Sequence, residues 1–195
     1  MIQQRQVYIL PAFAFLGTHP KTDLSPLSSK TILKQYMDKT KKTIQTFAEY
    51  SFQKGHRKTD YSRWYREDKM YEVSYEAGFE PYVLMYTDDV PHYPELFLGW
   101  YYDKMSVFVL MELSGYQWFV LPDVYVVHQY HQISTEMKQY YSCSRAVMAT
   151  WRKQLQKQYG VDVYHLTTQQ RNDIKGGQTL YQIHMRQRMK EHINK

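Results

Sequence analysis

The sequence predicts an α/β fold, and three observations indicate this class. Short apolar or period-two runs typical of strands occur at 7–10, 71–75 and 118–121. Apolar residues at helical spacing occur between them and after them, over 29–50 and 134–159. The apolar fraction of 43% in 195 residues excludes wholesale disorder and suits one domain with its own core. Interleaved strands and helices are the pattern of an α/β protein.

The first part of the chain begins with a buried strand. Val7-Tyr8-Ile9-Leu10 is an apolar and aromatic run that stops at Pro11. Because such a strand needs sheet neighbours, its place near the first residue leads us to expect that an upstream part of the domain is missing. A proline-containing loop over 18–27 precedes the predicted helix at 29–50, and residues 55–64 are expected to form a loop that enters a short helix.

The second part of the chain supplies the remaining strands and helices. We expect strands at 71–75 and 82–86, a turn at 91–94 and a buried helix at 104–113. Two core strands are expected at 118–121 and 125–127, and two further helices at 134–159 and 179–193. The last helix is basic and follows the Gly176-Gly177 break. We therefore divide the chain into a domain at 1–160 and a basic helical tail at 161–195.

Composition limits the partners without selecting one. The net charge of +6 permits contact with nucleic acid, anionic membrane or phosphate, although solvated helix faces explain the basic stretches at 30–42 and 171–195 equally well. The 20 tyrosines and 4 tryptophans suit both cores and surfaces that stack on sugars. Cys143 is the single cysteine, which excludes an intramolecular disulfide and a Cys-based zinc site. No apolar run approaches the roughly 20 residues that span a bilayer, and no signal peptide is expected in these residues.

Two histidines leave the end of the predicted strand at 125–127. Ligands of open α/β sheets gather at strand ends, and neutral imidazole is a common metal ligand. His128 and His131 are therefore candidate metal ligands, although a spacing of three residues also fits ordinary loop histidines.

Two aromatic segments are further candidates. The loop at 97–104 ends in Asp103-Lys104 at a predicted helix start, where a carboxylate either caps the helix or acts as a general base. Polar and aromatic residues alternate over 56–64, a pattern that suits sugar binding and equally suits a surface helix capped by Thr59 or Asp60. The chain has no Gly-rich phosphate loop, no HExxH motif and no nucleophile elbow, and no two aspartates are separated by one residue.

Several short motifs occur in the order and approximate spacing of one enzyme family. They are Leu10-Pro11-Ala12-Phe13, Thr59-Asp60-Tyr61-Ser62-Arg63-Trp64, Phe79-Glu80-Pro81-Tyr82, the loop at 97–104, and Leu121-Pro122 followed by His128. Together they resemble glycosyltransferase family 49, which holds LARGE-like and β-1,4-glucuronyltransferase-like enzymes. The resemblance covers about 7–155, and it implies the carboxyl-terminal portion of a GT-A nucleotide-diphospho-sugar transferase fold.

The resemblance also implies roles for individual residues. In the family, an Asp-x-Asp pair and a late histidine hold Mn²⁺ against the UDP diphosphate, and His128 matches that histidine. Asp103 stands where the better-known members have Asn, so it is either the base that deprotonates the acceptor hydroxyl or an incidental acid at a position that orients substrate. The matched motif positions that we expect to bind substrate are Tyr61, Arg63, Trp64, Glu80 and Lys104.

The expected function follows from this resemblance. It is the transfer of a glucuronic acid or xylose type of sugar from a UDP-sugar to a glycan acceptor with inversion, by an enzyme of the Golgi membrane that faces the lumen. The family's Asp-x-Asp lies upstream of the Leu-Pro-Ala-Phe strand, so we expect this chain to be incomplete, with any membrane anchor in the absent part. The alternative is a non-catalytic remnant that binds glycan or a partner chain. We expect no nucleic-acid partner, because no motif matches a known module of that kind.

Overall fold

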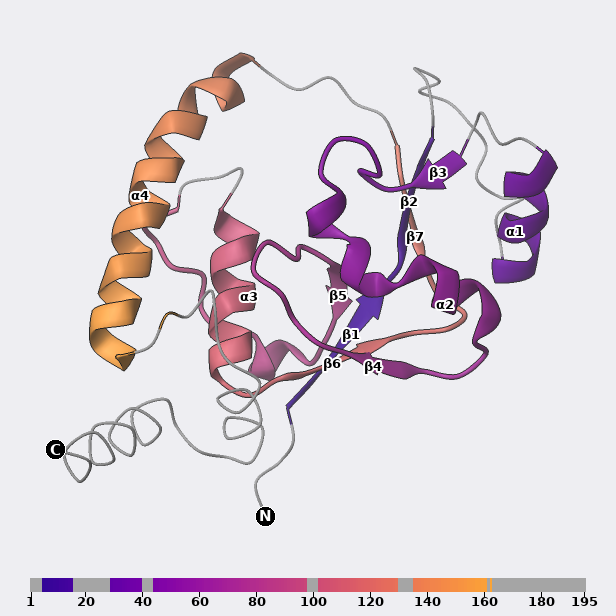
Figure 1. Ribbon diagram of the computed structural model, residues 1–195, viewed down its shortest axis with the longest axis horizontal. Coiled ribbons are helices and arrows are strands. Elements are labelled where there is room, and N and C mark those ends of the chain that lie inside the picture. Colours follow the sequence, from indigo (N-terminus) through magenta and orange to yellow (C-terminus); the bar gives the residue numbers. More distant parts are fainter. Residues whose placement is uncertain are drawn as a thin grey trace, which may run out of the picture. The chain divides into compact units, whose positions relative to one another are not determined.

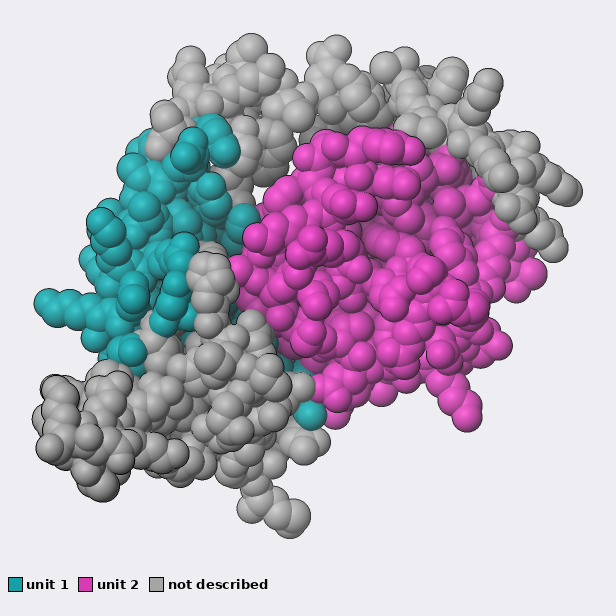
Figure 2. Space-filling model, in the orientation of Figure 1, with its two compact units in different colours: residues 1–5, 88–117, 134–195 teal, residues 6–87, 118–133 magenta. Residues whose placement is uncertain are grey.

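The computed structural model describes residues 5–15, 29–39, 44–97, 102–129, 135–160 and 162. The chain forms two compact units, which Figure 2 distinguishes by colour. Unit 1 holds residues 1–5, 88–117 and 134–195, and unit 2 holds residues 6–87 and 118–133. Strands and helices alternate along the chain, which confirms the predicted α/β class.

Figure 1 labels the α-helices and β-strands of the chain. They are β1 (Gln6–Leu10), β2 (Ala12–Phe15), α1 (Lys30–Lys39), β3 (Ile44–Thr46), η1 (Gln53–Gly55), η2 (Arg57–Thr59), α2 (Tyr61–Arg66), β4 (Tyr71–Val73), β5 (Tyr82–Leu84), η3 (Thr87–Asp89), α3 (Asp103–Leu113), β6 (Gln117–Val120), β7 (Val126–His128) and α4 (Thr135–Tyr159). Here η marks a single turn of 3₁₀ helix.

The strands form two small sheets. The first has the order β4-β6-β1-β5, in which β1 runs antiparallel to β5 and β4 runs antiparallel to β6. The second has the order β3-β2-β7, with β2 antiparallel to β3 and parallel to β7. The parallel register sets Ala14 opposite His128, so the centre of the second sheet positions a candidate site residue.

Pro11 is the residue at which the chain passes from one sheet to the other. It separates β1 from β2, and the predicted end of the first strand at this proline is confirmed. Proline has no backbone N–H to donate to a ladder, but its carbonyl still accepts a hydrogen bond from the Val126 amide at 2.9 Å. The carbonyl of Ile9, on the other side of the proline, accepts from the Leu121 amide at 3.1 Å. One short segment therefore contributes to both sheets.

Aromatic rings fill the core of unit 2. Phe13 on β2 is fully buried, and its ring centroid lies 5.4 Å from that of Trp64. On the other sheet, the Trp118 ring stacks on Tyr75 at 5.3 Å between centroids. Edge-to-face and offset ring pairs of this kind stabilise a core beyond the area they bury. The buried aromatic residues of this unit are thus structural.

The predicted helix at 29–50 is wrong in its second half. α1 ends at Lys39, and residues 44–46 form strand β3, which pairs with β2 so that Phe13 lies opposite Thr46. Ala48 then adopts a positive φ of 54°, which no α-helix allows. The apolar spacing fitted a helix, but pairing with the backbone groups of β2 decided the conformation.

Two lysines of α1, Lys30 and Lys34, bind backbone carbonyls, so at these two positions the interpretation of 30–42 as a solvated face is wrong. The Lys30 ammonium donates to the Glu67 carbonyl and that of Lys34 donates to the Tyr65 carbonyl, both at the carboxyl end of α2. Lys30 is only 5% exposed, and its ammonium lies 4.9 Å from the centroid of the Trp64 ring. Burial lowers the pKa of Lys30. Cations at the carboxyl end of a helix stabilise that helix, so these lysines stabilise α2 and the packing of α1 against it.

Unit 1 is built around helices α3 and α4. α3 is apolar on most sides, and Val107, Val109 and Met111 are almost fully buried, so the predicted buried helix is confirmed. α4 buries Met148, Trp151 and Leu155, which share one face at helical spacing. Among the residues that the structure describes, no helix is both long enough and apolar enough to cross a membrane. The predicted helix at 179–193 and nearly all of the tail at 161–195 lie outside the described residues.

Candidate functional site

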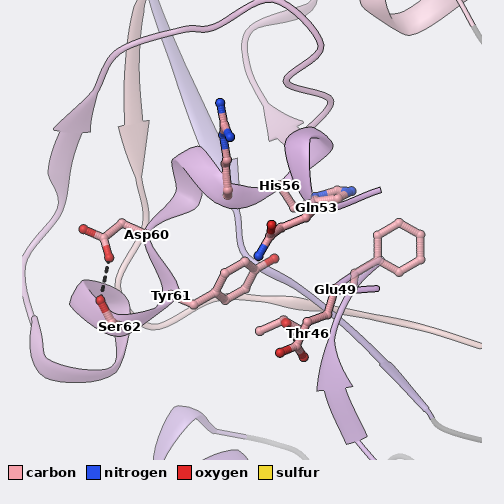
Figure 3. Close-up of a pocket in the computed structure, with 9 residues that line it drawn as sticks. Thr46, Glu49, Gln53, His56, Asp60, Tyr61 and Ser62 are labelled. Atoms are coloured by element: carbon pink, nitrogen blue, oxygen red, sulfur yellow. Dashed lines mark hydrogen bonds between the residues drawn. The ribbon is translucent and has the colours of Figure 1, made fainter. Parts of the chain in front are cut away.

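Unit 2 contains a polar pocket of about 230 Å³, shown in Figure 3. Its walls come from the end of β3 and the turn after it, from η1 and η2, and from the start of α2. The lining residues are Thr46, Phe47, Glu49, Gln53, His56, Arg57, Asp60, Tyr61 and Ser62. We call this cavity the polar pocket.

Asp60 begins α2 and fixes the wall on that side. Its backbone is left-handed, with φ of 50°, a conformation that Asp tolerates better than most residues. Its Oδ1 accepts from the Arg63 amide at 3.1 Å and from the Ser62 hydroxyl at 2.8 Å. The Ser62 hydrogen bond holds the pKa of Asp60 below its usual value. Asp60 is therefore the helix cap that the sequence offered as one alternative.

Tyr61 links α2 to the centre of the second sheet. Its hydroxyl donates to the Ala12 carbonyl at 2.8 Å and accepts from the Ala12 amide at 3.3 Å. The edge of its ring meets Phe13, with centroids 5.6 Å apart. Burial raises the pKa of Tyr61 well above the ordinary range, so the hydroxyl stays protonated at neutral pH. Figure 3 shows this ring between the Asp60–Ser62 pair and the side chains of Thr46 and Glu49.

The charged groups that line the polar pocket differ in their partners. Arg57 makes a bidentate pair with Glu76, with nitrogen–oxygen distances of 2.6 and 2.8 Å. This pair lowers the pKa of Glu76 and neutralises the guanidinium. On the opposite wall, the exposed carboxylate of Glu49 accepts from the Thr46 hydroxyl at 2.9 Å. The lining residues therefore include two carboxylates, Asp60 and Glu49, and one guanidinium, that of Arg57. Glu76 already neutralises the charge of Arg57.

A cluster of rings connects the polar pocket to His128. The centroid of the Phe47 ring lies 4.9 Å from that of the His56 ring and 4.8 Å from that of the His128 ring. Tyr82 completes the cluster, 5.9 Å from Phe47. His56 is 5% exposed, whereas His128 is half-buried at the carboxyl end of β7. Within the described parts of the chain, no three His, Cys, Asp or Glu side chains gather to hold a metal ion.

The other predicted substrate-binding residues of unit 2 lie around the polar pocket without lining it. Trp64 is fully buried, donates from Nε1 to the Leu121 carbonyl at 3.0 Å and does not line the pocket. Arg63 lies 4.1 Å above the Tyr71 ring and pairs with Glu67 at 3.6 Å. The Glu80 amide donates to the Gly55 carbonyl at 2.8 Å, which fixes the loop that carries η1.

Asp103 and Lys104 belong to unit 1, where they are the first two residues of α3. The N-cap is Tyr102, not Asp103, which corrects the capping alternative. Asp103 instead lies in the first turn, where the helix dipole favours a carboxylate, and its carbonyl accepts from the Ser106 hydroxyl at 2.6 Å. His131 lies outside the described residues.

Sequence reasoning missed four lining residues, Thr46, Phe47, Glu49 and Gln53. The first three fell inside the predicted helix at 29–50, which hid their common location. The β-branched pair Ile44 and Thr46 was the available signal for a strand, because such residues favour extended backbone.

Comparison with known proteins identifies relatives over most of the chain. The sequence model of the family described as "Glycosyl-transferase for dystroglycan" matches residues 1–163. The chain is 29% identical to the glycosyltransferase-like protein LARGE of Caenorhabditis elegans over 140 residues, which are 71% of this chain and 22% of that protein. It is also 29% identical to the xylosyl- and glucuronyltransferase LARGE1 of Homo sapiens over 174 residues, 86% of this chain and 22% of the relative. With the xylosyl- and glucuronyltransferase LARGE2s of Danio rerio, the identity is 29% over 178 residues, 88% of this chain and 23% of the relative. The chain thus spans less than a quarter of the length of these relatives.

Proposed function

This chain belongs to the family described as "Glycosyl-transferase for dystroglycan", and on that premise we propose that it is part of a glycosyltransferase. The reaction is the transfer of a glucuronic acid or xylose type of sugar from a UDP-sugar to a glycan acceptor, with inversion at the anomeric carbon. The family match over 1–163 is the observation that carries this proposal. Relatives named as xylosyl- and glucuronyltransferases support the choice of sugars.

The fold that we propose for the complete domain is GT-A, with this chain as its carboxyl-terminal portion. The parallel pair of β2 and β7 supports this assignment, because ligands of α/β sheets bind outside the carboxyl ends of parallel strands. His128 is the last residue of β7. The polar pocket adjoins the same region through Phe47.

We propose that His128 contributes one ligand to Mn²⁺. The described residues alone do not make a metal site, because no three potential ligands gather among them. The remaining ligands would have to be carboxylates of other residues, such as the family's Asp-x-Asp pair. When bound, the ion would neutralise charge on the leaving diphosphate.

The remaining roles concern the acceptor and its proton. An inverting transfer needs a group that takes the proton from the attacking hydroxyl, and a carboxylate such as Asp103 is competent for this. Lys104 follows it on α3 and supplies a positive charge for the substrate. Tyr61 forms a wall of the binding pocket, while Trp64, Arg63 and Glu80 hold that wall in place.

We place the complete enzyme in the Golgi membrane with its catalytic domain in the lumen, because family resemblance implies this location. The anchor would be a segment other than the helices described above.

A transfer assay tests the proposed function. The longest protein that the gene encodes is incubated with UDP-xylose or UDP-glucuronic acid, Mn²⁺ and a glycan acceptor, and products are identified by mass spectrometry. One added pentose or hexuronic acid, lost on chelation of the metal, is the expected result. Saccharide binding without transfer of either sugar would instead identify a glycan-binding remnant and overturn the enzymatic assignment.

A further inference from the structure

Phe47 follows directly after β3, and its ring contacts the ring of His128. We propose that Phe47 is a positioning residue, whose ring holds the His128 imidazole in one orientation for metal binding. This inference rests on the proposed function, in which His128 is a ligand of Mn²⁺. Phe47 belongs to none of the motifs that carry the family resemblance, so the inference adds a residue to that site.

The backbone of His128 is fixed by the second sheet, but its ring needs a further restraint. The parallel register sets His128 opposite Ala14, at the last residue of β7. Backbone pairing does not fix the outer torsion of a histidine side chain, which is broad rather than confined to three staggered values. A metal ligand has to present one ring nitrogen in a set direction, so neighbouring groups must orient the ring.

Phe47 supplies such a restraint through direct ring contact. The centroids of the Phe47 and His128 rings are 4.8 Å apart, and the ring planes are inclined by 49°. Aromatic rings at this separation touch, so the imidazole cannot rotate toward Phe47 without a clash. The phenyl ring also keeps water from the side of the imidazole that it covers, and an apolar shell of this kind limits solvent access to a metal site.

The Phe47 ring is itself held by two further rings. The edge-to-face contact with His56 has a centroid distance of 4.9 Å and an angle of 84°. Tyr82 makes a second edge-to-face contact, at 5.9 Å. His56 is only 5% exposed, so the Phe47 ring packs against the interior of unit 2. A side chain held by the core can in turn hold another.

The backbone around Phe47 is also fixed. Its amide donates to the Ala12 carbonyl at 2.9 Å, which attaches the residue to β2. The next residue, Ala48, has a positive φ of 54°, a conformation that is unfavourable for a residue with a Cβ atom. Its carbonyl accepts from the Phe52 amide at 2.9 Å, so a turn begins immediately after Phe47. Strained residues of this kind persist where the surrounding structure requires them, and they cluster at functional sites.

Three variants separate a positioning role from a contribution to packing alone. Phe47→Leu removes the ring and keeps an apolar side chain, whereas Phe47→Tyr keeps the ring. Phe119→Leu is the matched control, because Phe119 is also a half-buried phenylalanine of unit 2 and lies on β6, in the other sheet. Its ring contacts Tyr8 at 6.4 Å between centroids. Urea unfolding verifies that each variant is folded.

Electron paramagnetic resonance of free Mn²⁺ measures metal affinity without a reaction. The longest protein that the gene encodes is titrated with Mn²⁺ in the presence of UDP, and the site is the one whose binding His128→Ala weakens. Phe47→Leu should weaken this binding about tenfold, whereas Phe47→Tyr should stay within about twofold and Phe119→Leu should change nothing. The assay contains no acceptor, so an effect of Phe47 on an acceptor does not enter. Unchanged affinity in Phe47→Leu, an equal loss in Phe119→Leu, or no rescue by Phe47→Tyr would each overturn the inference.

NMR of the metal-free protein tests the ring contact itself. Histidine labelled with ¹³C at Cε1 gives one resonance for each ring, and the His128 resonance is the one lost in His128→Ala. Because an aromatic ring shifts the resonances of nuclei that it contacts, Phe47→Leu should move the His128 resonance and Phe119→Leu should leave it in place. A His128 resonance that is the same in all three proteins, the unmodified one and these two variants, would overturn the inference.

The outcomes distinguish the inference from the proposed function. Loss of Mn²⁺ affinity in His128→Ala but not in Phe47→Leu would retain the ligand and overturn the role of Phe47. Loss in both variants of a protein that transfers no sugar would retain the role of Phe47 and overturn the enzymatic function. Mn²⁺ binding that is absent, or that His128→Ala leaves unchanged, would overturn the role of His128 and that of Phe47 together.

Discussion

Replacement of Trp64 by Phe tests how much the buried aromatic core of unit 2 contributes to the stability of the fold. Trp64 belongs to the motif that resembles a substrate-binding segment, yet its side chain is fully buried. Its indole packs on Phe13 at 5.4 Å and on Tyr125 at 6.0 Å between centroids. Its Nε1 donates to the Leu121 carbonyl at 3.0 Å, and the Lys30 ammonium lies 4.9 Å from the ring centroid.

The magnitude follows from two losses. Phe has no N–H, so the Leu121 carbonyl loses this donor, which costs about 1–3 kcal/mol when the acceptor is buried. The smaller ring also leaves a void, for which we add about 1 kcal/mol because the Phe ring retains most of the contacts. We therefore expect Trp64→Phe to lower the free energy of unfolding by about 2–4 kcal/mol.

Urea unfolding followed by far-UV circular dichroism measures this change without relying on the fluorescence of the residue that is replaced. Tyr50→Phe is the control, because Tyr50 is 85% exposed and its replacement should alter stability by less than about 0.5 kcal/mol. A loss of stability below about 1 kcal/mol would refute the reasoning from burial and hydrogen bonding.

Three further predictions concern single side chains. His128→Ala should weaken Mn²⁺-dependent binding of UDP by the longest native protein at least about tenfold. Mutation of a residue that only supports a metal ligand already lowers metal affinity by about 10- to 100-fold. Unchanged binding in a titration with and without Mn²⁺ would remove His128 from the site. Asp103→Asn should lower kcat for sugar transfer at least about a hundredfold, because an amide cannot accept the proton; near-normal turnover would rule out the base. Burial raises the pKa of Tyr61 in the folded state above the unfolded value of about 10, so its stabilising contribution is complete below pH 10 and is lost as pH rises further. Tyr61→Phe should therefore make stability fall less steeply above about pH 10, and equal slopes in urea titrations would contradict the assignment.

Local patterns in the sequence determined the elements whose conformation depends on their own residues. The α/β class, the strand that stops at Pro11, the apolar helix α3 and the helix α4 were all predicted, and the structure confirms them. A loop over 55–64 that enters a short helix was also predicted; the helix is α2, which begins inside that range at Tyr61, and its cap Asp60 was one of the stated alternatives. The family motifs predicted the membership that the comparison of residues 1–163 shows. In each case a side chain acts on its own backbone or repeats with a fixed period, so neighbouring residues suffice.

Only the tertiary structure decided which side chains meet. The backbone groups of β2 need partners on both sides, and this demand makes residues 44–46 a strand although their spacing fits a helix. Forming β3 brings Glu49 and Thr46 opposite Tyr61 and Asp60, which come from a different part of the chain. Trp64 is buried for the same kind of reason, because the Leu121 carbonyl that it bonds lies 57 residues away along the sequence. Periodicity reports only which face of an element is apolar, whereas pairing between distant segments determines what that face contacts and where a pocket opens.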